Sequence, residues 1–391
     1  MTGESFIDVD FAQRCKHGQV ACGDVFVTRR IKEEGRVICV LSDGLGSGVK
    51  ASVLANMTAA MALKYTAAFV DVRKSARTIM DTLPICEVRK ISYSTFTIID
   101  LDSEGSVRFI EHGNPPLLVL RGTRPVKLEK STLTLEEWKD RVISYGSFDL
   151  ELEDRIVLFS DGVTQSAMGQ EGFPLGWGEQ RALEFLQRRL GDDPQMSSHN
   201  LSRALVDQAH ANDGLKARDD ITAGAIYFRR PRRLLVITGP PFSRERDSEL
   251  AHLVLTHPGR KAICGGTTAS IVERVLGRPV EMDLTSLDPE IPPVSRMEGV
   301  DLITEGTLTL ARVADLLETG RHPGPRRNGA TELVRLMTES DIVEFVVGTR
   351  INEAHQDPNI PVELDLRRNI VRRIASLLES RHLKETRLQY V

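Results

Sequence analysis

The chain has 391 residues, more than a single hydrophobic core usually organises, so its length predicts two domains. Hydrophobic residues make up 41% and charged residues 27%, which is near the average for soluble globular proteins and excludes a disordered or fibrous chain. The net charge of -4 leaves no basic excess for a nucleic-acid backbone, so we expect no nucleic acid as a partner.

Short apolar runs rich in β-branched residues dominate the chain from residue 19 to about residue 228. At hairpin-like spacing such runs predict strands, here VACGDVFVTRR, RVICVLSDG, STFTIIDLD, SVRFIEHG, PPLLVLRG, DRIVLFSDG and ITAGAIYF. Helices are expected among them at 49–69, 71–83 and 180–190. Long series of strands with helices inserted in blocks indicate an α+β fold of layered antiparallel sheets.

A basic segment interrupted by proline, RRPRR at residues 229–233, ends this pattern. We interpret it as a solvated linker, which predicts one domain at 1–228 and a smaller one at 229–391. Downstream, strand, glycine-rich turn and helix recur, which predicts an α/β domain with a mainly parallel sheet. The runs are LLVITG, KAICGG before TTASIVERVL, VDLITEG before TLTLARVADLL, and DIVEFVVGTR before a helix at 362–383.

The five cysteines contain no CxxC pair, which fits reduced thiols better than a disulfide framework or a zinc site. Cys39 lies in the apolar run VICVL and is expected in the core. The uncharged stretch 51–63 is too short to cross a bilayer, and the start of the chain lacks a cationic segment followed by an apolar one. We therefore expect a cytoplasmic protein with no membrane partner.

The strongest chemical signal is VLSDGLGSG at residues 40–48, an apolar strand that ends in an aspartate and runs into three glycines. Glycine lets the backbone approach closely, so the Asp43 carboxylate and the Gly44 carbonyl can face the same hard cation. The same pattern recurs at 155–164, where Asp161 ends a second apolar strand.

Two further acidic points complete the set. Asp24 follows Gly23 in the first strand region, and the pair Asp219 and Asp220 directly precedes the strand ITAGAI. Mg²⁺ and Mn²⁺ prefer carboxylate, carbonyl and water oxygens, and the sequence offers these without a cluster of histidine or cysteine. Singly, each Asp-Gly is also an ordinary turn signal, and the Asp219–Asp220 pair is also a common helix or loop cap.

Taken in this order, these residues resemble the PPM family, the type 2C metal-dependent Ser/Thr protein phosphatases, and specifically its bacterial SpoIIE-like branch. The likeness covers roughly residues 10–228, and the C-terminal domain resembles no family that we recognise. It implies a PPM-type antiparallel β-sandwich flanked by helices. It also implies two divalent ions, Mn²⁺ or Mg²⁺, which activate a shared water to attack the phosphate.

The resemblance also implies roles for the acidic residues. Asp43 bridges the two metals, the Gly44 carbonyl and Asp24 serve one ion, and Asp161 and Asp219 serve the other, with Asp220 as the alternative for the last ligand. On this reading the catalytic residues are Asp43, Asp161 and Asp219.

The chain departs from the family pattern at two positions. Leu45 stands where eukaryotic members carry a histidine, so the acid that protonates the leaving group is unassigned. Gln165 stands where the branch commonly has glutamate. Neither change removes an expected ligand.

In the C-terminal domain, Gly265, Gly266 and Thr267 lie between a predicted strand and a predicted helix, where backbone N–H groups and the helix dipole favour a small anion. Plain turn chemistry explains this segment equally well, because no GK[ST] or GxGxxG motif is present.

Our interpretation is a phosphatase acting on phosphoserine or phosphothreonine of a regulatory partner protein, with anti-sigma-factor antagonists as the leading substrate class by analogy. The C-terminal domain would regulate this activity, and the chain could act as a homodimer. Two alternatives remain: a pseudophosphatase scaffold that binds a partner under ligand control, and a hydrolase of small phosphate esters.

Overall fold

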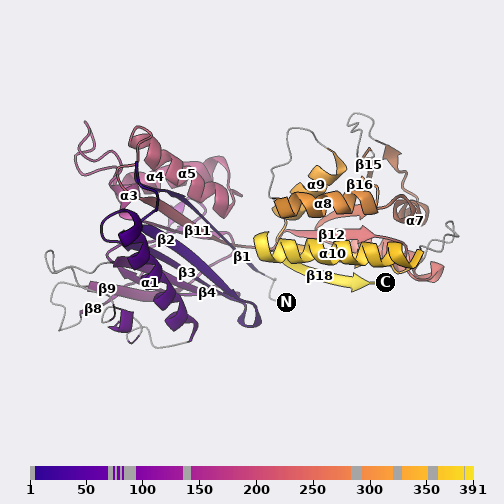
Figure 1. Cartoon of the computed structure of the whole chain (residues 1–391), viewed down its shortest axis with the longest axis horizontal. Helices are drawn as coiled ribbons and strands as arrows, with labels where there is room; N and C mark the ends of the chain where they lie inside the picture. The colour runs from indigo at the N-terminus through magenta and orange to yellow at the C-terminus, as the bar shows by residue number, and fades with distance from the viewer. Residues whose placement is uncertain are drawn as a thin grey trace. The chain divides into compact units, whose positions relative to one another are not determined.

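The computed structural model describes residues 5–68, 94–134, 142–282, 293–319, 328–350, 360–382 and 384–391, together with residues 74, 77–79 and 82. The chain forms two compact units, Met1–Arg230 and Pro231–Val391 (Figure 1). The predicted helix at 71–83 lies largely outside the described residues. Among the described residues, no helix is both long and apolar enough to span a bilayer.

Two antiparallel sheets form the first unit. The five-stranded sheet has the order β1 (Phe6–Arg14), β11 (Ile221–Arg229), β10 (Asp154–Phe159), β6 (Leu118–Arg121) and β7 (Arg124–Pro125). The six-stranded sheet has the order β2 (Asp24–Ile31), β3 (Arg36–Gly44), β4 (Ser94–Asp102), β5 (Ser106–His112), β9 (Val142–Asp149) and β8 (Ser131–Thr134). A 3-10 turn, η1 (Lys32–Glu34), joins β2 to β3.

The core of this unit lies between the sheets, where inward side chains of both interdigitate. Phe26, Cys39 and Phe109 come from one sheet and Ile156 and Ile226 from the other. Three helices pack on the five-stranded sheet: α3 (Asp161–Thr164), α4 (Gly178–Asp192) and α5 (Ser198–Asn212). Helix α1 (Gly48–Ala67) packs on the six-stranded sheet. The predicted α+β sandwich flanked by helices is confirmed, and Cys39 is fully buried as expected.

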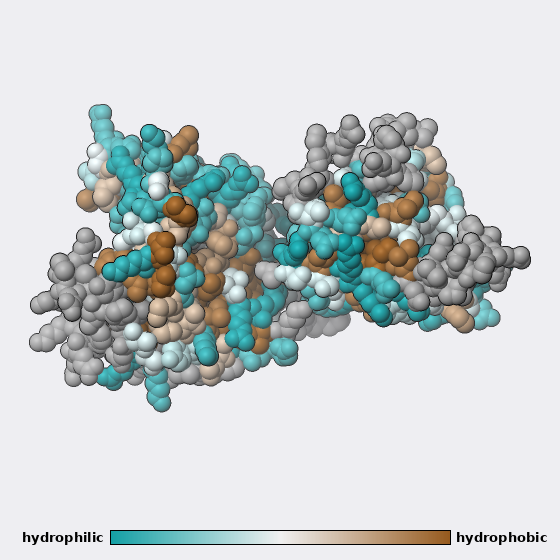
Figure 2. Space-filling view, viewed as in Figure 1, coloured by the Kyte–Doolittle hydropathy of each residue, from teal (hydrophilic) through white to brown (hydrophobic). Residues whose placement is uncertain are grey.

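Helix α1 packs closely because small side chains form its buried face, at Ala51, Ala55, Thr58, Ala59 and Ala62. Its opposite face carries an apolar row, with Val49, Val53 and Met57 exposed at 68%, 52% and 48%. Figure 2 shows apolar side chains gathered over α1 amid a largely hydrophilic surface. The outer face of this helix is therefore more apolar than the solvent-facing side of an amphipathic helix usually is.

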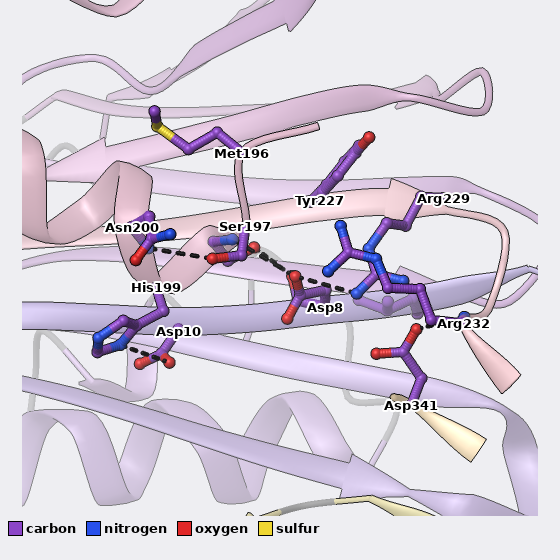
Figure 3. Close-up of polar contacts among 12 residues, drawn as sticks. Asp8, Asp10, Met196, Ser197, His199, Asn200, Tyr227, Arg229, Arg232 and Asp341 are labelled. Carbon is purple, nitrogen blue, oxygen red and sulfur yellow. Dashed lines mark hydrogen bonds and ion pairs between the residues drawn. The ribbon is translucent and has the colours of Figure 1, made fainter. Parts of the chain in front are cut away.

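Strand β1 and helix α5 were not predicted from the sequence. The two elements pack against each other. The Ser197 hydroxyl caps α5 by accepting from the Asn200 N–H, and His199 contacts Asp10 of β1 at 3.1 Å (Figure 3). Asp8 of β1 pairs with Arg229 at 3.3 Å. Arg229 is only 4% exposed, so the expectation of a solvated linker was wrong at this residue, which belongs to β11.

The second unit contains one seven-stranded sheet. Its order is β14 (Glu281–Met282), β15 (Ser295–Met297), β16 (Val300–Thr304), β13 (Arg260–Cys264), β12 (Arg233–Thr238), β17 (Ile342–Val347) and β18 (Glu385–Tyr390). The run from β16 to β18 is parallel, whereas β14 and β15 pair antiparallel. The predicted mainly parallel sheet is confirmed.

Helices cover both faces of this sheet. Its helical elements are η2 (Arg244–Arg246), α6 (Asp247–Thr256), α7 (Gly266–Leu276), α8 (Thr307–Thr319), α9 (Gly329–Glu339) and α10 (Ile360–His382). Side chains of α8, α9 and α10 share one hydrophobic cluster with the sheet, and those of α6 and α7 share another. Burial on both faces explains why the strands read as continuous apolar runs.

The expectation of reduced thiols was wrong for two cysteines. Cys15 and Cys22 form a disulfide, with their Cα atoms 4.6 Å apart, because the turn from β1 to β2 folds the chain back on itself. The two residues are seven positions apart, a spacing that matches no disulfide motif. Cys39 and Cys264 are free and buried, and Cys86 lies outside the described residues.

Candidate metal centre

The two predicted aspartates of the six-stranded sheet are direct neighbours. Asp43 is the penultimate residue of β3, a strand with almost every residue buried, and it lies opposite Asp24, the first residue of β2. Asp24 is 3% exposed and Asp43 is half-buried. The Gly44 N–H donates to the Gly23 carbonyl at 3.1 Å, which joins the two Asp-containing segments. One end of the sheet therefore carries two adjacent carboxylates.

The glycine of each Asp-Gly motif is required by a close backbone approach. A Cβ on Gly44 would lie 2.1 Å from the Ala51 carbonyl oxygen of α1, and one on Gly162 would lie 2.1 Å from the Asp220 carbonyl oxygen. Both obstacles are backbone atoms, which cannot rotate away as a side chain can. The motifs are therefore more than turns, because each lets a second chain segment pack against an aspartate.

Asp161 begins the short helix α3 one residue after Ser160, the residue that follows β10, and a hydrogen bond from the Gly162 N–H favours its negative charge. The Gln165 side chain, one helical turn later, donates from Nε2 to Asp161 Oδ2 at 2.7 Å. The departure from glutamate at position 165 thus supplies a donor to the carboxylate. This contact fixes the orientation of Asp161.

The two adjacent aspartates before β11 have different environments. Asp219 is 42% exposed, and its carboxylate lies 3.8 Å from the Lys16 ammonium. Asp220 is 4% exposed and accepts from two backbone groups, the Lys16 N–H at 2.9 Å and the Gly23 N–H at 2.8 Å. The Asp220 carboxylate therefore anchors the segment between β1 and β2, while the Asp219 carboxylate is only partly buried.

Four of these carboxylates influence one another electrostatically. Burial raises the pKa of Asp43 to about 9, and the charges of Asp24, Asp161 and Asp219 add to this effect. Burial likewise raises the pKa of Asp24 to about 7, although the hydroxyls of Ser160 and Thr222 oppose the shift. The pKa values of Asp161 and Asp219 are also raised, chiefly by burial. The structure thus brings four of the five predicted aspartates, Asp24, Asp43, Asp161 and Asp219, together at one end of the sandwich.

The donor set fits hard divalent cations. Asp24 Oδ2 is buried and has no hydrogen-bond partner among the described residues, a costly state for a carboxylate that no cation compensates. The neighbouring ligand atoms are carboxylate and carbonyl oxygens, which Mg²⁺ and Mn²⁺ prefer. Within the described residues, no three of these four aspartates offer oxygens all within 4.8 Å of one another.

Sequence reasoning missed the residues that orient this centre. The role of Gln165 comes from a local contact with Asp161, that of Asp220 from contacts across the fold, and the Cys15–Cys22 disulfide adjoins Asp220. The position of Gln165, one helical turn after Asp161, was the only signal available beforehand.

The second unit carries the predicted anion segment at the start of α7. Gly265 is the N-cap residue of α7, with φ 132°, and the helix has no side-chain cap. The buried Thr268 hydroxyl, in the first turn, has no hydrogen-bond partner among the described residues. By contrast, the Glu305 carboxylate accepts from the Leu308 N–H at the start of α8. The N-terminus of α7 is thus the less occupied of the two.

Comparisons with known proteins point to one family. The model for the family stage II sporulation protein E (SpoIIE) matches residues 33–229. Stage II sporulation protein E of Bacillus subtilis (strain 168) is 25% identical over 213 residues, which are 54% of this chain and 24% of that protein. The Priestia megaterium protein of the same name is 21% identical over 194 residues, 48% of this chain and 31% of that protein.

The fold is also similar to a solved structure of the PP2C phosphatase domain and a fragment of the regulatory domain of SpoIIE from Bacillus subtilis. The two share 20% identity and a TM-score of 0.49, over 58% of this chain and 64% of that chain. Asp43, Asp161, Asp219 and Asp220 lie within the matched range 33–229, whereas Asp24 precedes it. Because the family model covers about half of the 391 residues, the chain belongs to the SpoIIE family.

Proposed function

We propose that this chain is a metal-dependent phosphatase that removes phosphate from phosphoserine or phosphothreonine of a regulatory partner protein. The observation that carries the proposal is the convergence of Asp24, Asp43, Asp161 and Asp219, whose pKa values are all raised by shared burial and most of which repel one another. Such a cluster is unfavourable without cations and favourable with them.

The residues divide naturally between two ions. Asp24 and the Gly44 carbonyl would serve one, Asp161 and Asp219 the other, and Asp43 both. Two divalent ions bound there would lower the pKa of a water and neutralise charge on the phosphate. We assign Asp220 to positioning instead of ligation, because both of its oxygens already accept from backbone N–H groups.

The protein's own residues orient this centre. Gln165 fixes the Asp161 carboxylate, and Asp220 fixes the backbone that precedes Asp24. Lys16 lies beside Asp219 at the exposed side of the cluster, where a cation can attract an incoming phosphate. Most of the catalysis in phosphoryl transfer comes from such positioning and charge stabilisation.

The substrate class follows from the family. The curated relatives are named stage II sporulation protein E, and the SpoIIE-like branch that this chain resembles implies a phosphorylated regulatory protein as substrate. We therefore propose a phosphorylated regulatory protein as substrate, with an anti-sigma-factor antagonist as the first to be tried.

We assign a regulatory role to the second unit, with a small anion at the N-terminus of α7. The free N-terminal N–H groups and the unpartnered Thr268 hydroxyl support this assignment. Inorganic phosphate, titrated into the full chain and into Gly265→Asp, tests it. Binding to the unaltered chain alone, with a change in phosphatase rate, is the expected result.

The proposed activity is tested with a phosphothreonine peptide and p-nitrophenyl phosphate, with and without Mn²⁺, after metal stripping. Asp43→Asn and Asp161→Asn should abolish turnover, whereas Asp207→Asn is the matched control, because the half-exposed Asp207 pairs with Arg14 and Arg203 and is not one of the clustered aspartates. Turnover of the small ester alone would indicate a small-ester hydrolase. Mn²⁺ binding without turnover of either compound would indicate a pseudophosphatase.

A further inference from the structure

The disulfide joins the two points that Asp220 also joins. Cys15 directly precedes Lys16, and Cys22 directly precedes Gly23, while the N–H groups of Lys16 and Gly23 both donate to the Asp220 carboxylate. The two sulfur atoms and an Asp220 oxygen lie within 4.8 Å of one another. A covalent link and a carboxylate thus clamp the same short loop at the same two places.

This loop, residues 15–22, touches several parts of the candidate metal centre. The His17 N–H donates to the Ala217 carbonyl at 2.8 Å, just before Asp219. The Gln19 side chain lies where a Cβ on Gly48 would meet it at 2.6 Å, at the start of α1. A change in the loop would therefore reach both the segment before β11 and the segment after Asp43.

The loop also leads directly into Asp24. Gly23 is buried, and a Cβ there would lie 2.9 Å from Asp220 Oδ2 and 3.0 Å from the Ala51 Cβ. The Gly23 carbonyl accepts from the Gly44 N–H. The position of Gly23 thus determines how Asp24 and Gly44 lie relative to each other, and Cys22 is bonded to Gly23.

Thiols in solution can reach the Cys15–Cys22 pair, whereas they cannot reach the other cysteines that the structure describes. Cys15 is exposed and Cys22 is half-buried, whereas Cys39 and Cys264 are fully buried. Thiol–disulfide exchange requires that a thiolate reach one sulfur of the bond. Among the cysteines that the structure describes, exchange is therefore confined to the loop beside the metal centre.

We propose that Cys15 and Cys22 form a reversible thiol–disulfide exchange site whose oxidised form organises the metal centre. In the reducing direction, two thiols or one dithiol give up two electrons and two protons and become a disulfide. The Cys15–Cys22 bond breaks and two protein thiols form. The inference deepens the proposed function, since it concerns the affinity of the same centre for its ions.

The physical reason is pre-organisation. With the bond intact, the Lys16 and Gly23 donors are held at the spacing that one carboxylate spans, so Asp24 is fixed before any ion binds. Reduction restores conformational freedom to the loop, and ion binding must then order it again. Loss of a group that orients metal ligands weakens metal affinity by about tenfold or more.

The test begins with the full chain in glutathione buffers of varied ratio. Alkylation and mass spectrometry give the fraction of Cys15 and Cys22 oxidised at each ratio. Calorimetric titration with Mn²⁺ alone gives the dissociation constant, and hydrogen exchange of the 15–24 region reports loop order without metal. Two variants are treated in parallel: Cys15→Ser/Cys22→Ser, which cannot form the bond, and Cys264→Ala, a cysteine of the second unit.

The expected result is a dissociation constant for Mn²⁺ about tenfold larger in reduced than in oxidised protein, with faster exchange in the 15–24 region. The double serine variant should match reduced protein at every glutathione ratio, and Cys264→Ala should respond as the unaltered chain does. A disulfide that persists at every ratio, or equal affinity and exchange in both states, would overturn the inference. Absence of Mn²⁺ binding in both states would overturn the proposed metal centre instead, and hydrogen exchange would then decide whether the disulfide controls the loop.

Discussion

Asp24 lies directly opposite Asp43 in the antiparallel pairing of β2 with β3. Facing side chains in such a pair are close neighbours, and like charges directly opposite each other are destabilising. Burial raises the pKa of Asp24 to about 7 and that of Asp43 to about 9, and the Asp24 charge adds to the shift at Asp43. A fold that keeps two buried carboxylates face to face gives up stability without cations and regains it when they bind.

The first prediction concerns Asp43→Asn. Asparagine mimics the neutral form that burial and three neighbouring carboxylates impose on Asp43, so the substitution should stabilise the metal-free protein at pH 8 by about 1–3 kcal/mol, because the folded wild type must bind a proton there that the unfolded chain releases. The same change should abolish Mn²⁺ binding. Urea unfolding in the presence of a chelator measures the first effect and calorimetry the second. Equal stabilisation by Asp207→Asn would show that the effect is a general loss of negative charge.

The second prediction is the pH dependence of stability. The folded pKa values of Asp24 and Asp43, about 7 and about 9, exceed the ordinary value of 3.8, so the folded state holds more protons than the unfolded state between these limits. Stability of the metal-free protein from this source is fully present below about pH 4 and is lost as pH rises toward 9. Saturating Mn²⁺ replaces those protons, so metal affinity should rise with pH.

Denaturation midpoints measured from pH 5 to 9, with a chelator and with Mn²⁺, check this sign. The Asp43→Asn variant should show a shallower loss in the chelator series. A metal-free stability that increases over this pH range would contradict the assigned shifts.

The third prediction concerns Gln165, which donates to Asp161 Oδ2 at 2.7 Å. Gln165→Ala should weaken Mn²⁺ binding by about tenfold, because Asp161 loses the group that orients it. In metal-free titrations Gln165→Glu should raise the pKa of Asp161 further, since a second carboxylate would replace the amide donor that faces Asp161. Gln180→Ala is the matched control, because the exposed Gln180 donates a hydrogen bond to Glu184 within α4 and lies outside the aspartate cluster. Unchanged affinity in Gln165→Ala would remove the positioning role.

Much of this fold and site could be predicted from sequence, and the limits have physical causes. Asp43 lies near the end of the apolar strand β3, and Asp161 follows the apolar strand β10 after Ser160, so consecutive residues predict where both aspartates lie. Strand β1 escaped prediction because it lies at a sheet edge and carries the polar Asp8 and Asp10, and α5 depends on β1 for its packing.

The support around the aspartates could not be predicted, because it joins residues far apart in the chain. Asp220 contacts Lys16 and Gly23 across about two hundred positions. The Cys15–Cys22 bond exists because β1 and β2 meet through a turn, not because of a motif. The choice between Asp219 and Asp220 as ligand likewise depends on burial and hydrogen bonds that only the fold defines.

The fourth prediction concerns Asp220. Asp220→Ala should lower the free energy of unfolding by about 2–4 kcal/mol, because two backbone N–H groups lose their acceptor and one of them, at Gly23, is buried. Asp220→Asn keeps one acceptor oxygen and should cost about half as much. Urea denaturation of both variants in a chelator measures the difference. An equal cost for both would show that charge, and not acceptor number, stabilises the loop.

The fifth prediction concerns Gly162, which follows Asp161 in the second Asp-Gly motif. Gly162→Ala should destabilise the protein by about 3 kcal/mol or more, since the new Cβ would lie 2.1 Å from the Asp220 carbonyl oxygen and backbone must shift to admit it. Gly191→Ala in α4 is the matched control, because its Cβ would meet only a methyl group at 3.9 Å. That control should be neutral or slightly stabilising, since alanine has a higher helix propensity than glycine.

Thermal denaturation compares the stability of the two variants. Titration of the folded fraction with Mn²⁺ shows whether displacing Asp220 also separates Asp161 from Asp219. A Gly162→Ala variant as stable as the control, with unchanged Mn²⁺ affinity, would mean that the close approach of these two segments does not build the metal centre.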